Sequence, residues 1–231
     1  MPAMLGIVIP VHNEEAWLAS CLQAVVKAAA SPKLHRETVH TLVVLDSCTD
    51  GSACIAASFG IPTLQVQARN VGIARATGAQ RCLEMGVRWL AFTDADTLVS
   101  PDWLAEQLDQ RSDAVCGTVA VNDWSGHAPH LALRFKASYN DAHGHRHIHG
   151  ANLGVSAQAY RDAGGFPPLA CSEDVALVQA LQARGASIAW SAAPRVVTSA
   201  RKNFRAAGGF GATLLQGFPE AGLAGEAAAC A

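Results

Sequence analysis

Short apolar runs alternate with longer amphipathic stretches through the first half of the chain. The apolar runs predict buried strands at residues 4–10, 41–46, 63–66 and 88–92. The stretches between and after them predict helices at residues 14–30, 53–59, 71–85 and 101–110. This repeated order of strand and helix is typical of a parallel sheet covered by helices on both faces. We therefore expect an α/β protein with a Rossmann-like, mostly parallel sheet.

The second half of the chain is less regular. Its pattern predicts a strand at 114–121, a helical or mixed segment at 126–140, an extended Gly- and His-rich segment at 143–155, a helix at 172–184 and two short strands around Ile188 and Val196. No internal repeat or linker interrupts the series, so we expect one domain over residues 1–206. The Gly- and Ala-rich stretch at 207–231 is expected to be a flexible tail.

Composition narrows the class of protein. The chain has 231 residues, half of them hydrophobic and 16% charged, which suits a folded domain with a substantial core. A formal net charge of −2 provides no basic surface for nucleic acid. Any anionic ligand must therefore be held locally, by a cation, a few arginines or backbone amides.

Cysteine usage and hydropathy bear on the compartment. The seven cysteines are scattered and never spaced as Cys-x-x-Cys, which disfavours a disulfide framework or structural zinc and suits a reducing environment. No basic residue precedes the first apolar run, and no run reaches the roughly 18 apolar residues of a spanning helix. We expect a cytoplasmic protein without a transmembrane segment. Contact with a membrane surface and the oligomeric state stay open.

Polar residues follow each predicted strand of the first half. They lie at 10–15, 46–52, 69–75 and 94–97. In an open α/β sheet the ligand binds beyond the carboxyl ends of the strands. These four groups are therefore expected to meet at one rim.

Asp94 and Asp96 form an acidic pair at this rim. In extended chain, residues two apart point the same way and lie roughly 6–7 Å apart. Two such carboxylates would repel a diphosphate unless a hard divalent cation accepted oxygens from both partners. Oxygen ligands favour magnesium or manganese over zinc. A solvated turn that begins with aspartate is the alternative, and the pair alone does not decide between them.

Seven motifs, taken in order, resemble the family 2 glycosyltransferases of the GT-A fold. They are IPVHNEE at 9–15, VVLDSCTDGS at 43–52, ARNVGIARATG at 68–78, AFTDADT at 91–97, GANLGVS at 150–156, GGFPP at 164–168 and SEDVAL at 172–177. The resemblance extends over residues 4–200. It implies that residues 1–98 bind a nucleotide diphosphate sugar, with UDP-sugars favoured, and that residues 99–206 bind a hydroxyl-bearing acceptor. It also implies sugar transfer with inversion, assisted by Mn2+ or Mg2+.

The resemblance gives individual residues roles at the donor. Pro10 and Glu14 would lie against the nucleoside, Asp46 would accept a hydrogen bond from the base, and Arg75 with Arg69 and Asn70 would hold the base or the diphosphate. Asp96 would ligate the metal and Asp94 the metal or the ribose. Structural explanations remain beside these roles: Asp46 can begin a turn, Glu14 suits the first turn of a helix, and Arg75 can lie on a solvated helix face.

The second acidic cluster would act on the acceptor. By the resemblance, Asp174 is the catalytic base, with Glu173 beside it. Ser172 is a good N-cap residue, and helix-terminal carboxylates are stabilised by the macrodipole, which favours the charged form and argues against a strong base. A base that accepts its proton late can nevertheless work with an ordinary carboxylate pKa. A purely capping role is the alternative.

Histidines alternate along 143–149. If this segment is extended, His143, His145, His147 and His149 face one side and would contact the acceptor or the diphosphate, bind a second metal, or form a surface strand. We expect the contact to the acceptor or diphosphate from His147, His149 and Asn152. Many members of the resembled family carry a late histidine as a further metal ligand, and Thr198 stands there in this chain.

Two other classes of protein remain. A sugar-phosphate nucleotidyltransferase would carry a basic, Gly-rich loop after the first strand, but this chain has Pro-Val-His-Asn-Glu-Glu at 10–15. A non-catalytic nucleotide-sugar binding protein would not need both acidic clusters. Sugar, acceptor and pathway are not readable from the sequence.

Overall fold

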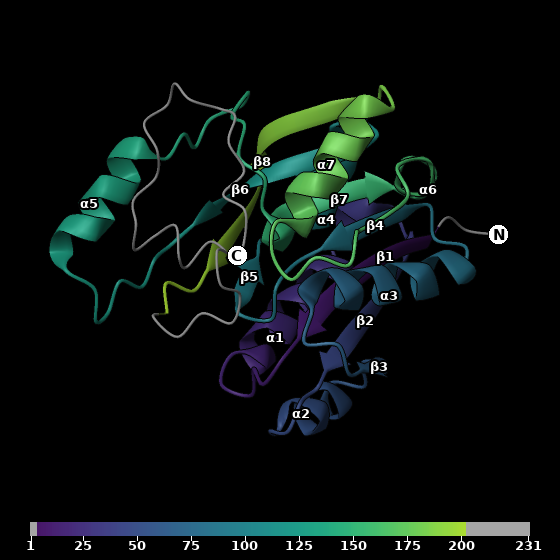
Figure 1. Cartoon of the computed structure of the whole chain (residues 1–231), viewed down its shortest axis with the longest axis horizontal. Helices are drawn as coiled ribbons and strands as arrows, with labels where there is room; N and C mark the ends of the chain where they lie inside the picture. Colours follow the sequence, from purple (N-terminus) through teal and green to yellow (C-terminus); the bar gives the residue numbers. More distant parts are fainter. Residues whose placement is uncertain (1–3, 202–231) are drawn as a thin grey trace.

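The computed structural model describes residues 4–201. One eight-stranded sheet runs through them in the order β3-β2-β1-β4-β7-β6-β8-β5 (Figure 1). Its parallel half consists of β1 (Met4–Val11), β2 (Thr38–Asp46), β3 (Thr63–Val66) and β4 (Trp89–Phe92). The remaining strands are β5 (Thr97–Val99), β6 (Ala114–Ala120), β7 (Leu153–Ser156) and β8 (Ile188–Thr198). The predicted α/β class is confirmed.

Helices cover both faces of the sheet, because both faces of the central strands are apolar. On β1, Leu5, Ile7 and Ile9 belong to the core beneath α1, while Val8 faces the core beneath α3. The first face carries α1 (Leu18–Ala29), α2 (Ser52–Ser58) and α4 (Trp103–Asp109); the second carries α3 (Val71–Glu84), α6 (Ala157–Asp162) and α7 (Glu173–Ala183). Helix α5 (Pro129–Ser138) projects from the body (Figure 1), and short 3-10 helices span Pro32–Leu34 and Gly150–Asn152.

Strand direction decides where a ligand can bind. β4 and β6 each pair antiparallel with β7, and β6 pairs parallel with β8. β8 therefore runs in the same direction as β1, β2 and β4. The carboxyl ends of these four strands share one rim, where the polar segments that follow them converge.

Several sequence-based expectations are corrected. Ile188 and Val196 lie on one strand, β8, rather than on two; its register against β6 shifts between Gly117 and Thr118, which disguises it as separate runs. β5 and α6 were not expected, because both are short and β5 is defined by its pairing with distant β8. The helix expected at 14–30 begins only at Leu18.

Two glycines inside α3 are explained by close packing. A Cβ on Gly72 would lie 2.4 Å from the carbonyl oxygen of Pro167, and one on Gly78 would lie 2.4 Å from Val8 Cγ1. Glycine lets α3 approach the sheet and the 167–169 segment despite its lower helix propensity.

The expected tail at 207–231 lies outside the described residues. Within residues 4–201, none of the helices combines the length and the apolar character that crossing a membrane requires.

Candidate functional site

A cleft of about 620 Å³ opens at the rim formed by the carboxyl ends of β1, β2, β4 and β8. Segments 69–75, 147–151 and 170–175 complete its walls. The structure brings together at this cleft nearly all of the residues singled out by the sequence: Pro10, Glu14, Asp46, Arg69, Asn70, Arg75, Asp94, Asp96, His147, His149, Glu173 and Asp174. Asn152, His143 and His145 do not line it.

The cleft is rich in carboxylates. Within residues 4–201, six acidic side chains line it, against three arginines. The acidic residues are Glu14, Asp46, Asp94, Asp96, Glu173 and Asp174, and the arginines are Arg69, Arg75 and Arg201. A diphosphate entering this cleft would meet an excess of negative charge, so its binding calls for an additional cation.

Asp46, at the end of β2, organises the loop before α3. Its carboxylate accepts hydrogen bonds of 2.8 Å from the backbone N–H groups of Ala68, Arg69 and Asn70, and it is 4% exposed. Burial by itself would raise the pKa of Asp46, but these N–H groups bring it below the ordinary value. Asp46 thus shapes the loop that carries Arg69, in addition to facing the cleft.

The side chain of Asn70 forms hydrogen bonds with other parts of the fold. Its side-chain oxygen accepts from the backbone N–H of Ile73 at 3.0 Å and caps α3, and its amide nitrogen donates to the carbonyl of Pro168 at 3.1 Å. Arg69, with a positive φ of 47°, is exposed at the edge of the cleft. Of the two, Arg69 has the side chain better placed to reach a ligand.

The sequence analysis considered Asp94 and Asp96 in extended chain, but the structure places them in a turn. The N–H of Thr97 donates to the carbonyl of Asp94 at 3.1 Å and closes a turn between β4 and β5. The two carboxylates consequently have different partners. Asp94 pairs with Arg75, and Asp96 lies 3.3 Å from Arg201.

Arg201 is a site residue that the sequence analysis did not identify. Its guanidinium donates to both carboxylate oxygens of Glu14, which is buried beneath it, and reaches Asp96. Arg201 follows the carboxyl end of β8. The rule that site residues follow strand ends would have found it, had the last strand been recognised as parallel to the first.

Arg75 is buried rather than solvated. It is 3% exposed, and its guanidinium donates to Asp94 and to Glu173. Gly150 packs on this guanidinium, since a Cβ there would lie 2.5 Å from its carbon. The two carboxylates raise the pKa of Arg75 further, against the effect of burial, so the group stays charged. Arg75 therefore joins the Asp94 turn to the start of α7.

Asp174 lies in the first turn of α7, but Ser172 does not cap that helix. Ser172 adopts φ 59°, and its side chain makes no capping bond. Asp174 instead accepts from the backbone N–H groups of Val175 at 2.8 Å and Gly150 at 2.7 Å. Burial raises the pKa of both Asp174 and Glu173, with Arg75 opposing the rise. A raised pKa makes Asp174 a stronger base than the helix dipole alone would suggest.

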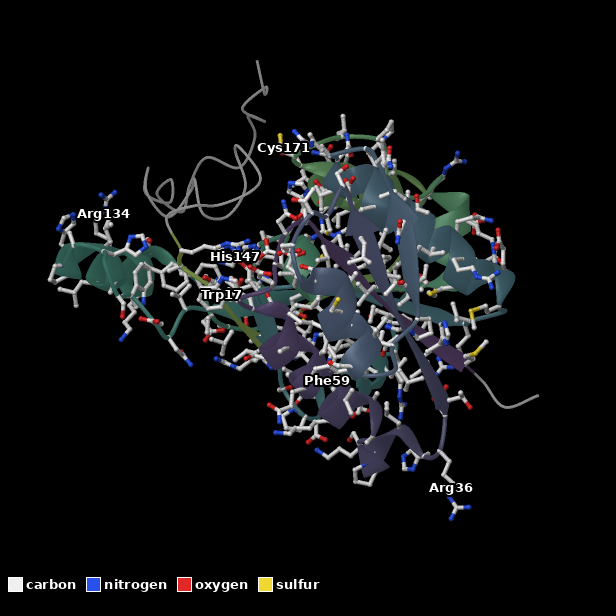
Figure 2. The ribbon with its side chains drawn as sticks, turned by 90° about the horizontal axis from the view of Figure 1, so that it is seen from below. Trp17, Arg36, Phe59, Arg134, His147 and Cys171 are labelled. Atoms are coloured by element: carbon white, nitrogen blue, oxygen red, sulfur yellow. The ribbon has the colours of Figure 1, made fainter. Side chains whose placement is uncertain are left out.

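Three of the four alternating histidines stack on one another. The ring centroids of His145 and His147 are 5.4 Å apart, and those of His147 and His149 are 5.9 Å apart. Tyr139 stacks on His147 at 4.1 Å, and its hydroxyl lies 2.9 Å from His149 Nε2. His143 is exposed at a turn instead. His147 and His149 line the cleft, and Figure 2 places His147 between the projecting α5, marked by Arg134, and the body of the sheet.

Asn152 lies inside the fold, away from the cleft wall where a contact to acceptor or diphosphate was expected. It is fully buried; its amide nitrogen donates to the carbonyls of Thr118 at 2.7 Å and Pro194 at 2.6 Å, and its oxygen accepts from Trp103 at 2.8 Å. All of these partners belong to the fold. Asn152 therefore ties β8 to β6 and α4.

Asp94 and Asp96 suit a hard divalent cation by their chemistry. Both present carboxylate oxygens to a cleft with excess negative charge. Burial raises the pKa of Asp96 to about 6; Arg201 opposes the rise, and Asp94 and Glu14 add to it.

Thr198, where a late histidine was considered, bonds Thr97 through its hydroxyl at 2.9 Å. Among residues 4–201, no three His, Cys, Asp or Glu side chains already converge as a metal site.

Comparison with known proteins connects this cleft to one family. Residues 6–162 match the family model described as glycosyl transferase family 2. A search of the curated proteins gave no significant match.

Solved structures share the fold at low sequence identity. TarS 1–349 from S. aureus, in complex with UDP, is 16% identical, with a TM-score of 0.64 over 86% of this chain and 60% of that one. Mannosyltransferase PcManGT from Pyrobaculum calidifontis, in complex with GDP-Man and Mn2+, is 18% identical, with a TM-score of 0.63 over 88% and 59%. GalNAc-T7 with UDP, GalNAc and Mn2+ is 15% identical, with a TM-score of 0.62 over 86% and 44%. The chain thus spans about 60% of the length of the first two structures.

Proposed function

Because the chain belongs to glycosyl transferase family 2, we propose that this cleft transfers a sugar from a nucleotide diphosphate sugar to a hydroxyl-bearing acceptor. UDP-linked donors are favoured, and the transfer inverts the anomeric carbon. Membership in the family speaks against the sugar-phosphate nucleotidyltransferase alternative. A non-catalytic binding protein is disfavoured by the two acidic clusters that face the same cleft.

The charge balance of the cleft carries the proposal. Among the residues that the structure describes, six carboxylates against three arginines leave the cleft with excess negative charge, so a diphosphate is not held by these side chains alone. We assign Asp96, with Asp94, to a divalent cation, Mn2+ or Mg2+. When bound, such a cation supplies the positive charge that neutralises the departing nucleoside diphosphate. The similarity to mannosyltransferase PcManGT, solved with GDP-Man and Mn2+, supports this assignment.

The donor nucleotide is assigned to the parallel half of the sheet. Pro10 and Glu14 flank the nucleoside position, Asp46 faces the base, and the exposed Arg69 reaches the diphosphate. Asn70 supports this wall through its cap on α3. Arg75 contributes indirectly, because its guanidinium donates to Asp94 and holds that side chain in place. A donor bound in this way has its anomeric carbon toward α7.

Asp174 is assigned as the base on the acceptor side. The acceptor hydroxyl gives its proton to the Asp174 carboxylate as its oxygen bonds to the anomeric carbon, while the bond from that carbon to the diphosphate breaks. The N–H of Gly150 fixes one carboxylate oxygen at 2.7 Å, and Glu173 is held by Arg75. His147 and His149 precede Gly150 and line the same cleft, and we assign them to the acceptor or the diphosphate.

Nucleotide binding with and without the cation tests the proposal. The full chain is titrated with UDP and GDP by calorimetry, in Mn2+ and after chelation. We expect affinity to fall at least about tenfold on chelation and in Asp96→Ala, as expected when a bridging charge is lost. Asp123→Ala, at an exposed loop position, is the matched control. Equal affinity under all of these conditions would overturn the assignment of a divalent cation to Asp96 and Asp94.

The assignment of His147 and His149 needs its own experiment. His147→Ala and His149→Ala are expected to raise the acceptor KM or to weaken donor binding, while His143→Ala, at the exposed turn, changes neither. Release of UDP from a panel of UDP-sugars and acceptors is the measurement. If both cleft variants behave like the parent chain, the histidines have no role in substrate binding.

A further inference from the structure

Arg201 lies beside Asp96, the residue assigned above to the divalent cation. Its guanidinium joins Glu14, from the loop after β1, to Asp96, from the turn after β4. The side chains of Glu14, Asp96 and Arg201 are 6%, 15% and 19% exposed. This is a partly desolvated ion pair, in which the attraction is stronger than at an open surface.

The fold fixes this placement from both sides. Thr97 directly follows Asp96 and pairs with Thr198 at the end of β8, and their hydroxyl groups lie 2.9 Å apart. Beyond β8, the N–H of Arg201 donates to Ser199 Oγ at 3.1 Å. The pairing of β5 with β8 therefore delivers Arg201 to Asp96.

A guanidinium and a divalent ion cannot share the same oxygens of Asp96, because both are cations and would repel at that distance. We propose that Arg201 is a tethered cation that competes with the divalent ion for Asp96. In the donor-free protein the divalent ion binds weakly. A nucleoside diphosphate strengthens that binding, because its phosphates both coordinate the ion and attract the displaced guanidinium.

This inference rests on the proposed function, since it assumes the cation site at Asp96. Its test is direct binding of Mn2+ to the full chain, followed by the electron paramagnetic resonance signal of free Mn2+. Without nucleotide, Arg201→Gln is expected to bind Mn2+ at least about fivefold more tightly than the parent chain. With saturating UDP the difference shrinks to within about threefold. The control is Arg195→Gln, which removes an exposed arginine of β8 that pairs with Asp141.

The outcomes separate the two ideas. Equal Mn2+ affinity in the parent chain and Arg201→Gln, together with its loss in Asp96→Asn, would overturn the competition and leave the metal assignment intact. Unchanged affinity in Asp96→Asn would overturn both. Thermal unfolding checks the fold of each variant. Should Arg201→Gln fail to fold, Arg201→Lys, which cannot form the two-pronged contact, is expected to bind Mn2+ at least about twofold more tightly; no change there overturns the competition.

Discussion

The guanidinium of Arg75 donates to the carboxylate of Glu173 in the wall of the cleft, and both side chains are 4% exposed. The same guanidinium reaches Asp94, so one arginine on α3 connects the proposed cation side of the cleft to the helix that bears the proposed base. A buried charge of this kind is costly when it loses its partner.

Replacing Arg75 is therefore expected to destabilise the protein. Arg75→Met leaves Glu173 buried without a counter-charge and should lower the free energy of unfolding by about 3–5 kcal/mol. Urea denaturation measures this. Arg81→Gln on the same helix removes an exposed pair with Glu84 and should change stability by less than about 0.5 kcal/mol. Equal effects of the two variants would show that the Arg75 pair contributes no more than a surface pair.

Asp174→Asn separates chemistry from donor binding. The amide keeps the shape of the side chain but accepts no proton, so kcat is expected to fall by about 10²- to 10⁴-fold. The dissociation constant for UDP should stay within about threefold, since Asp174 acts on the acceptor. Transfer rates and calorimetric UDP binding are compared in the same preparation. Transfer near the parent rate would show that another group removes the proton.

His149 makes stability depend on pH. Burial lowers the pKa of His149 to about 3, and repulsion from His147 and His145 adds to the shift. The folded protein then binds fewer protons than the unfolded chain, so stability present above an unfolded pKa of about 6.5 is lost as the pH falls. Between pH 7.5 and about pH 5 this loss is expected to be about 2 kcal/mol.

His149→Gln isolates that contribution. Glutamine still bonds Tyr139 but does not titrate, so unfolding free energies at the two pH values should differ by about 2 kcal/mol less than in the parent chain. His130→Gln, at an exposed position of α5, should retain the parent pH dependence. Identical pH profiles for the parent chain and His149→Gln would mean that His149 titrates alike in the folded and unfolded states.

Asn152→Ala tests whether this residue serves the fold or the substrate. The change removes the buried hydrogen bonds to Trp103 Nε1 and to the carbonyls of Thr118 and Pro194, and it should cost at least about 2 kcal/mol of stability. The acceptor KM of the folded protein should stay within about threefold. Asn122→Ala, at an exposed position, is the control. A raised KM at unchanged stability would instead restore Asn152 to the substrate.

The sequence by itself determined the parallel half of the sheet and the rim of the cleft. Apolar runs such as 4–10 and helical periods such as 71–85 arise from burial of the chain's own local surface, so they are visible without any partner. The rule that ligands bind beyond the carboxyl ends of parallel strands then placed the groups around Asp46, Arg75 and Asp94 together. The motifs around these residues led to the family that the comparison confirmed.

Only the tertiary structure decided which charges meet. Arg75 and Glu173 are 98 residues apart in the chain, and Arg201 and Glu14 are 187 apart. Their contacts depend on where β8 enters the sheet and on how α7 packs against α3, and no local periodicity records either. For the same reason the sequence did not predict the turn between Asp94 and Asp96 or the burial of Asn152. The turn precedes β5, which pairs with the distant β8, and Asn152 is buried by its contacts with β6, β8 and α4.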